Sequence, residues 1–85
     1  MVVHGDVQGV GFRYFVMRRA SQLGLKGWVR NNDDGTVELV AEGPRTDLEQ
    51  LLRTAEEGPR LARVSRVDAQ WSNATGGLQG FDLTA

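Results

Sequence analysis

The sequence has 85 residues, about half of the roughly 150 that serve as the prior for one domain, so we expect a single domain over residues 1–85. It contains no cysteine and one histidine, His4, which excludes disulfides, cysteine-based metal sites and sites that need two imidazoles, and fits a cytoplasmic protein. Ten basic against eleven acidic side chains give a net charge of −1, which argues against a nucleic-acid or lipid surface, and no apolar stretch approaches the roughly 18 residues of a membrane span.

Apolar residues at the start of the chain predict a strand and then a helix. Residues 1–3 form a short apolar run that stops at His4 and Gly5. From Phe12 to Leu23 the apolar residues follow helical spacing, which is typical of one face of a helix, and Gly24 is placed to end it. The glycine-bearing stretch between the two elements predicts a loop.

The next segment predicts a β-hairpin. Residues 28–31 and 36–41 read as two strands, and Gly35 occupies the turn between them, where a positive φ is needed. Every second residue of the second strand, starting at Val37, should face the core.

The second half of the chain predicts one more helix and two more strands. Residues 46–49 match the S/T-x-x-E capping box, so Thr46 should cap a helix that ends at Gly58. Residues 62–71 then show alternation that predicts a strand with Trp71 packed toward the core, and residues 81–83 predict a short final strand.

The predicted element order is therefore β-α-β-β-α-β with a short final strand. In a chain of this length, that order is typical of the α+β, ferredoxin-like split βαβ arrangement, in which two helices cover one face of an antiparallel sheet. This fold hosts many unrelated activities, so function has to be argued from a site.

The segment from Gly5 to Arg13 is the part of the sequence that carries chemistry. It joins a strand to the first turn of a helix, where unpaired N–H groups and about half a positive charge favour an anion. Gly9 and Gly11 allow successive N–H groups to turn inward around that anion, and the planar guanidinium of Arg13 can bind two of its oxygens. The spacing alone fits a tight turn with a solvated arginine equally well. P-loop and dinucleotide motifs are absent.

The stretch Val7–Arg13, followed after one helix by Gly27–Asn31 and Asp34–Glu38, closely resembles the acylphosphatase family. The order and spacing of these blocks match the family, and the resemblance covers essentially the whole chain. It implies a ferredoxin-like enzyme that hydrolyses the carboxyl–phosphate bond of acyl phosphates, releasing a carboxylic acid and inorganic phosphate without a metal or other cofactor. Family members commonly carry several residues before the first apolar run, so we expect either a short first strand or a truncated start.

The resemblance also implies the site residues. Arg13 is similar to the family's phosphate-binding arginine, and Asn31 corresponds to the asparagine that orients the attacking water. The implied backbone cradle for the phosphate consists of Gln8, Gly9, Val10, Gly11 and Phe12.

Elementary chemistry is consistent with this residue set. The leaving group is a carboxylate with a pKa of about 4 to 5, so no general acid has to protonate it. Phosphoryl transfer depends mainly on positioning and on stabilising charge, which a guanidinium and several N–H groups can do. The Asn31 carboxamide can accept a hydrogen bond from the water and donate one to a phosphoryl oxygen.

Other residues near these blocks have simpler interpretations. We expect the adjacent Asp33 and Asp34 to form the turn rather than bind a metal, and His4 to be structural or solvent-facing. Asp6 is acidic and close to the cradle, so its side chain should point away from a bound phosphate. An aromatic ring around the acyl group of a substrate is a further possibility, formed by Tyr14, Trp28 and Trp71.

Eleven glycines in 85 residues exceed the usual share of about 7%. Most of them lie at the ends of predicted helices and strands or in the last loop, while Gly9 and Gly11 belong to the cradle. Gly5 and Gly27 lie beside the matching blocks, where we expect a close approach of two backbones.

Three alternatives to a free-standing acylphosphatase remain open at this stage. The first is a non-catalytic ferredoxin-like module that only binds an anion, although such a module does not require Asn31. The second is an RNA-binding domain, but the aromatic RNP pattern is missing. The third is a carbamoyl-phosphate-hydrolysing domain like those in hydrogenase-maturation carbamoyltransferases, which sits in a much longer chain. The expected partners are a small acyl phosphate and inorganic phosphate, with no nucleic acid, no membrane and no second copy of the chain.

Overall fold

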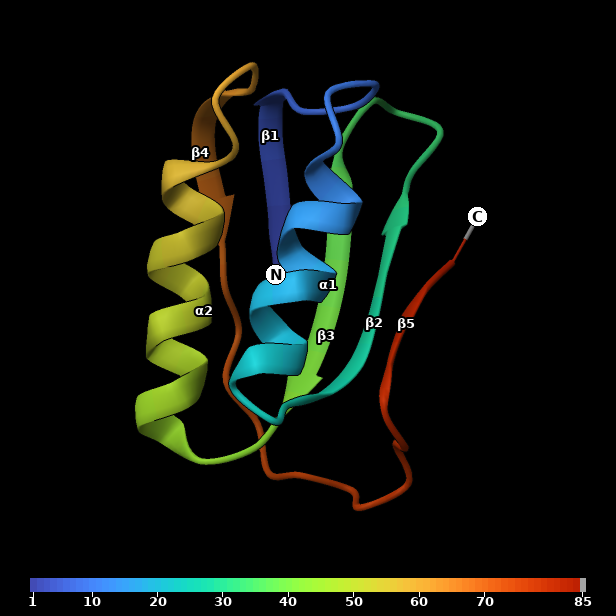
Figure 1. Ribbon diagram of the computed structural model, residues 1–85, viewed down its shortest axis with the longest axis vertical. Coiled ribbons are helices and arrows are strands. Elements are labelled where there is room, and N and C mark those ends of the chain that lie inside the picture. The colour runs from blue at the N-terminus through green and yellow to red at the C-terminus, as the bar shows by residue number, and fades with distance from the viewer. Residues whose placement is uncertain (85) are drawn as a thin grey trace.

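The computed structural model describes residues 1–84, and it confirms the predicted element order. Two helices lie side by side on one face of a five-stranded sheet (Figure 1). The elements are β1 (Val2–Asp6), α1 (Phe12–Gln22), β2 (Lys26–Asn31), β3 (Val37–Glu42), α2 (Arg45–Glu57), β4 (Arg63–Asp68) and β5 (Phe81–Leu83). The fold is α+β and ferredoxin-like with a short final strand, as predicted.

The strand order across the sheet is β4-β1-β3-β2-β5. Neighbouring strands are antiparallel except β2 and β5, which are parallel, so the expected antiparallel sheet has one parallel edge. In consequence β1, β2 and β5 run in the same direction, and their carboxyl ends lie at the upper edge of the sheet in Figure 1. The loop that leads into α1 starts at the same edge.

A single cluster of buried apolar side chains lies between the helices and the sheet. In β3, Val37 and Leu39 are fully buried while Val40 is exposed, as the alternation predicts. The cluster consists of Val3, Val7, Phe12, Val16, Ala20, Leu25, Val29, Val37, Leu39, Leu51 and Ala55. Within residues 1–84, no helix is long and apolar enough to cross a membrane.

Strand β1 is longer than predicted, because it continues through Gly5 to Asp6. Its pairing with β4 shifts register between His4 and Gly5. Gly5 has a φ of 127°, and a side chain at this position would collide with the carbonyl oxygen of Arg63. The close backbone approach expected at Gly5 is confirmed, and this approach lets β1 stay paired with β4 through the irregularity instead of ending there.

The predicted helix cap at Thr46 is wrong. Helix α2 begins at Arg45 with Pro44 as its N-cap, and no side chain of the described residues caps it. The Leu48 N–H already donates to the Pro44 carbonyl at 3.0 Å, so Thr46 lies inside the first turn. Proline restricts φ to a value compatible with a helix start, so the helix begins two residues too early for the capping box. The predicted end at Gly58 is confirmed.

The prediction for the residues after Asp68 is also wrong. Strand β4 ends at Asp68, which pairs with Val2 of β1, and residues 69–80 are not in a strand. Trp71 is 41% exposed instead of packed in the core, and the Arg45 guanidinium lies 3.8 Å from the centre of its ring. Apolar alternation overestimated the strand because pairing with β1 ends at Val2.

The close backbone approach expected at Gly27 is confirmed. A side chain there would collide with the carbonyl oxygen of Val40 on the neighbouring strand β3. Gly24, which follows α1 with a φ of 70°, has open space around it among the described residues. Gly27 is therefore required by the close approach of β3, whereas Gly24 is favoured by its left-handed backbone conformation.

We expect Gly27→Ala to lower the free energy of unfolding by about 3 kcal/mol, because β2 and β3 must separate to admit a methyl group. Gly24→Ala is the matched control, and it should cost only the backbone strain of a left-handed conformation, about 1 to 2 kcal/mol. Chemical denaturation of both variants measures the difference, and equal losses would contradict the close approach.

Candidate active site

The loop between β1 and α1 is held at both ends by buried apolar side chains. Val7 and Phe12 are each 1% exposed, whereas Gln8, Gly9 and Gly11 between them are exposed. Gly9 and Gly11 have φ values of 74° and 78°, and a Cβ atom at either position would meet no described atom within 4 Å. Positive φ at these two positions is a conformation that glycine adopts readily and that occurs in anion-binding nests.

Helix α1 begins without a side-chain cap from the part of the chain that the structure describes. Gly11 is its N-cap residue, and the first helical bond runs from the Phe15 N–H to the Gly11 carbonyl at 3.0 Å. The first turn holds no acidic residue. Since the N–H groups of a first turn have no intrahelical partner, this end of the helix favours an anion.

Arg13 lies in this first turn and is half-buried. Its Nη1 donates to the carbonyl oxygen of Thr84 at 2.8 Å. Thr84 is held in turn, because its own N–H donates to the Val29 carbonyl of β2 at 2.8 Å. A neutral carbonyl thus fixes the guanidinium, and no Asp or Glu of residues 1–84 lies within ion-pair distance of it.

Asn31 is the last residue of β2 and pairs with Val37, the first residue of β3. The turn that follows is closed by its own backbone bonds. The Asn32 N–H donates to the Thr36 carbonyl at 2.9 Å, and the Gly35 N–H donates to the Asn32 carbonyl at 3.2 Å. Asn31 therefore stands at the end of a paired strand beside a closed turn, and the predicted hairpin is confirmed.

Two carboxylates brace this turn. Asp34 accepts hydrogen bonds from the N–H and the hydroxyl of Thr36, at 3.0 and 2.6 Å, so its predicted turn-forming role is confirmed. The bond from the Thr36 hydroxyl, followed by the bond from its N–H, lowers the pKa of Asp34. Glu38 accepts from Asn32 Nδ2 at 3.2 Å and from Arg30 at 3.0 Å, and these bonds lower the pKa of Glu38.

The side chain of Gln8 joins the loop to the same turn. Its Nε2 donates to the carbonyl of Asn32 at 2.7 Å and to the carbonyl of Thr36 at 2.9 Å. One amide nitrogen therefore bridges the two ends of the turn that follows Asn31. The sequence pattern indicated only a backbone role for Gln8 and gave no sign of this contact.

A small hollow opens at the carboxyl ends of β1, β2 and β5. Its volume is about 130 Å³, below the roughly 300 to 1,000 Å³ of pockets for drug-sized ligands, and it suits a small group such as an anion. It is lined by Val7, Gly9, Gly11, Phe12, Arg13, Tyr14, Asn31 and Leu83. The predicted site residues that it brings together are Gly9, Gly11, Phe12, Arg13 and Asn31.

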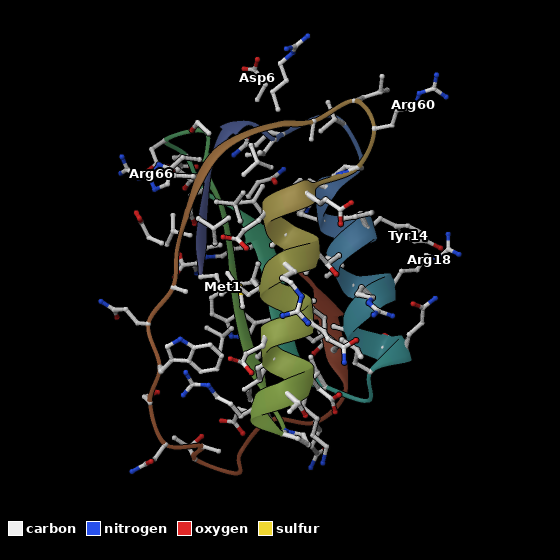
Figure 2. The ribbon with its side chains drawn as sticks, turned by 90° about the vertical axis from the view of Figure 1, so that its left-hand side faces the viewer. Met1, Asp6, Tyr14, Arg18, Arg60 and Arg66 are labelled. Atoms are coloured by element: carbon white, nitrogen blue, oxygen red, sulfur yellow. The ribbon has the colours of Figure 1, made fainter. Side chains whose placement is uncertain are left out.

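Two predicted cradle residues, Gln8 and Val10, are not among the residues that line the hollow. Conversely, Val7 and Leu83 line it without having been predicted, and Tyr14 was considered only as part of an aromatic ring. Tyr14 is 59% exposed and extends outward from the start of α1 in Figure 2. Leu83 reaches the site through the parallel pairing of β5 with β2, for which the sequence carries no local motif.

Trp28 and Trp71, two members of the possible aromatic ring, do not line the hollow. The Arg30 guanidinium lies over Trp28, 4.9 Å from the ring centre, and Trp71 lines a larger groove of about 760 Å³ beside β3. Three carboxylates line that groove: Glu38, Glu42 and Asp68. Their charge disfavours a phosphate there, so the hollow at Arg13 is the better candidate for an anion site.

Asp6 and His4 are not among the residues that line the hollow. Asp6 is exposed and projects beyond the end of the sheet in Figure 2. His4 Nε2 lies 2.9 Å from Asp68 Oδ2, and this hydrogen bond lowers the pKa of Asp68. Across residues 1–84, no three His, Asp or Glu side chains are grouped so that they could hold a metal ion.

The fold and the hollow together define a class: small ferredoxin-like α+β proteins with a glycine-bearing loop and an arginine at the carboxyl edge of the sheet. Comparison with known proteins narrows this class. The chain belongs to the acylphosphatase family, because the family model for acylphosphatase matches residues 1–83.

Individual relatives agree with this assignment. An acylphosphatase from Salinibacter ruber is 54% identical over 79 residues, which are 93% of this chain and 83% of that protein. The crystal structure of acylphosphatase from Bacillus subtilis is similar with a TM-score of 0.95 at 39% identity, covering 99% of this chain and 93% of that one. The crystal structure of full-length HypF in the phosphate- and nucleotide-bound form is similar with a TM-score of 0.86 at 31% identity, covering 99% of this chain but 11% of that one. The chain is therefore an enzyme, a hydrolase of the acylphosphatase type, and its family implies an acyl phosphate as substrate and phosphate as product.

The braced turn beside Asn31 should respond to acid. Hydrogen bonding lowers the pKa of Asp34 and of Glu38 in the folded state. Each carboxylate therefore stabilises the folded state at pH values above its unfolded pKa, which is about 3.9 for Asp and about 4.3 for Glu. This stabilisation is lost as the pH falls through the lowered folded pKa. We expect both contributions to be constant between about pH 7 and pH 5 and to disappear below about pH 4.

Asp34→Asn separates this effect from general acid denaturation, because asparagine keeps an acceptor oxygen but does not titrate. The melting temperature of the variant should fall less steeply than that of the wild type below about pH 4. Parallel melting curves across the whole pH range would contradict the assignment.

Proposed function

We propose that this enzyme hydrolyses the carboxyl–phosphate bond of small acyl phosphates at the hollow beside Arg13, without a metal ion or cofactor. The carrying observation is that Arg13 and Asn31, which belong to different elements, line one hollow together with Gly9 and Gly11. In this proposal Asn31 orients the attacking water. The phosphoryl group is bound by Arg13 and by the backbone N–H groups of Gln8, Gly9, Val10, Gly11 and Phe12.

The contacts of Arg13 suit it to bind a phosphoryl group. An arginine has five N–H donors in a planar fork, more than its bond to Thr84 uses. Because Thr84 is itself bonded to Val29 of β2, the guanidinium is held at a fixed place before a substrate arrives. A fixed cation next to the N-terminus of α1 stabilises charge on the equatorial oxygens during transfer.

The position of Asn31 suits it to orient water. Its backbone is paired with Val37, so the carboxamide is carried by a strand rather than by a free loop. The amide oxygen can accept a hydrogen bond from the water, and the amide nitrogen can donate one to a phosphoryl oxygen. Together these bonds hold the nucleophile in line with the bond that breaks.

The reaction balances without a protein acid or base. Attack forms a bond between the water oxygen and phosphorus, and it breaks the bond between phosphorus and the acyl oxygen, whose electron pair leaves with the carboxylate. That carboxylate has a pKa of about 4 to 5 and needs no proton to leave. A proton of the water passes to a phosphoryl oxygen, so the products are a carboxylate and inorganic phosphate.

In this proposal residues 1–85 act as one domain and as a monomer. The lack of cysteine in the sequence supports a reducing, cytoplasmic environment. A net charge of −1 supports a small-molecule substrate rather than nucleic acid.

Purified protein should hydrolyse benzoyl phosphate at the same rate with and without a chelator. Inorganic phosphate should inhibit competitively, because it is a fragment of the substrate and occupies the same hollow. Heat-denatured protein corrects for spontaneous hydrolysis. Activity that a chelator abolishes and a divalent metal restores would overturn the metal-free mechanism, and noncompetitive inhibition would place the phosphate site elsewhere.

Substitutions should separate the two side chains. Arg13→Ala should raise KM and lower kcat, because the guanidinium interacts with charge in both the ground and the transition state. Asn31→Ala should mainly lower kcat, by about 10²- to 10³-fold, the range for loss of one positioned donor. Arg18→Ala is the matched control, since Arg18 is an exposed arginine of α1, and it should keep wild-type kinetics. Equal changes in KM and kcat for the Arg13 and Asn31 variants would contradict separate roles.

The same assays distinguish the two alternative functions. A non-catalytic module would bind inorganic phosphate in a manner that depends on Arg13 but would hydrolyse no acyl phosphate above background. A carbamoyl-phosphate-hydrolysing relative would use the same site and break the same type of bond, and it would turn over carbamoyl phosphate faster than benzoyl phosphate.

A further inference from the structure

We infer that the side chain of Gln8 is a positioning residue for hydrolysis, because it holds the phosphate-binding loop in place relative to Asn31. This inference rests on the proposed function, in which the loop binds the phosphoryl group and Asn31 orients the water. It concerns the carboxamide of Gln8, whereas the proposed function uses only the backbone N–H of that residue.

The loop follows β1 and Asn31 ends β2, and these two strands are not neighbours in the sheet. β3 lies between β1 and β2 in the sheet, so the loop after β1 and the end of β2 are separated by one strand. Gln8 Nε2 spans this separation with bonds of 2.7 Å to the Asn32 carbonyl and 2.9 Å to the Thr36 carbonyl. The link therefore connects the two parts of the site directly.

The two acceptors of Gln8 are fixed points. The Asn32 carbonyl also accepts from the Gly35 N–H, and the Thr36 carbonyl also accepts from the Asn32 N–H. A carbonyl oxygen has two lone pairs, so the Gln8 amide can use the second one on each. Asn31 is joined to Asn32 by a peptide bond, so a loop held to this turn is also held to Asn31.

This link should matter more for turnover than for stability. Gln8 is exposed, and a hydrogen bond of this kind contributes about 1 kcal/mol to folding. In-line attack is far more sensitive to geometry, since a displacement of about 1 Å can cost about 100-fold in rate. Loss of the amide should therefore leave the fold and the phosphate contacts in place while the loop moves relative to the water that Asn31 holds.

The test replaces Gln8 with methionine, which keeps a similar length but donates no hydrogen bond. Gln8→Met should lower kcat for benzoyl phosphate about tenfold or more and change KM by less than about twofold. Gln8→Ala, which removes the side chain without the bulk of methionine, should behave in the same way. Wild-type kcat in both variants would overturn the inference.

Arg19→Met is the matched control, because it removes a hydrogen bond of 2.9 Å from α1 to Gln50 of α2, and Arg19 does not line the hollow. It should lower the melting temperature at least as much as Gln8→Met and keep kcat within about twofold of the wild type. A fall in kcat that follows the loss of stability in both variants would mean that Gln8 has only a structural role.

A double-mutant cycle gives the decisive comparison. If Gln8 acts through the geometry of Asn31, then Gln8→Met should change kcat by less than about twofold in the Asn31→Ala background. A full tenfold loss in that background would overturn the inference. The proposed function fails separately, because it requires hydrolysis by the wild type and loss of turnover in Asn31→Ala whatever Gln8 does.

Discussion

The site depends on the common direction of β1, β2 and β5. Since these three strands run the same way, the loop after β1, the end of β2 and the end of β5 all lie at one edge of the sheet. The split βαβ order places β3 between β1 and β2, so the loop after β1 and the end of β2 are one strand apart at that edge. The helices add the N-terminus of α1 to the same edge. Without this topology the glycine-bearing loop, Arg13 and Asn31 would not line one hollow.

Charge is distributed so that the hollow favours an anion. Among residues 1–84, its lining includes one arginine and no carboxylate. The nearby carboxylates of Asp34 and Glu38 accept hydrogen bonds from the turn and from β2, while Asp6 projects past the sheet. None of these three carboxylates lines the hollow. Neutral groups hold the guanidinium and the loop in place. The Thr84 carbonyl accepts a hydrogen bond from Arg13, and the Gln8 amide donates one to the turn after Asn31.

Much of this arrangement could be predicted from the sequence, because side-chain identity carries the relevant information. Apolar spacing located both helices and the hairpin, and the block from Val7 to Arg13 identified the loop that lines the hollow. The errors have a common physical origin. The start of α2 depends on backbone bonding to Pro44, and the end of β4 depends on where its partner strand stops. The acceptors of Arg13 and Gln8 are backbone carbonyls, which every residue has, so no sequence pattern marks them.

The bond between Arg13 and Thr84 joins residues that are 71 positions apart in the chain. During synthesis, the glycine-bearing loop and Asn31 are made before β5. The guanidinium reaches its final support only after residue 84 has been added and has bonded to Val29. The final position of the guanidinium therefore depends on a segment at the other end of the chain as well as on the segment that carries the arginine.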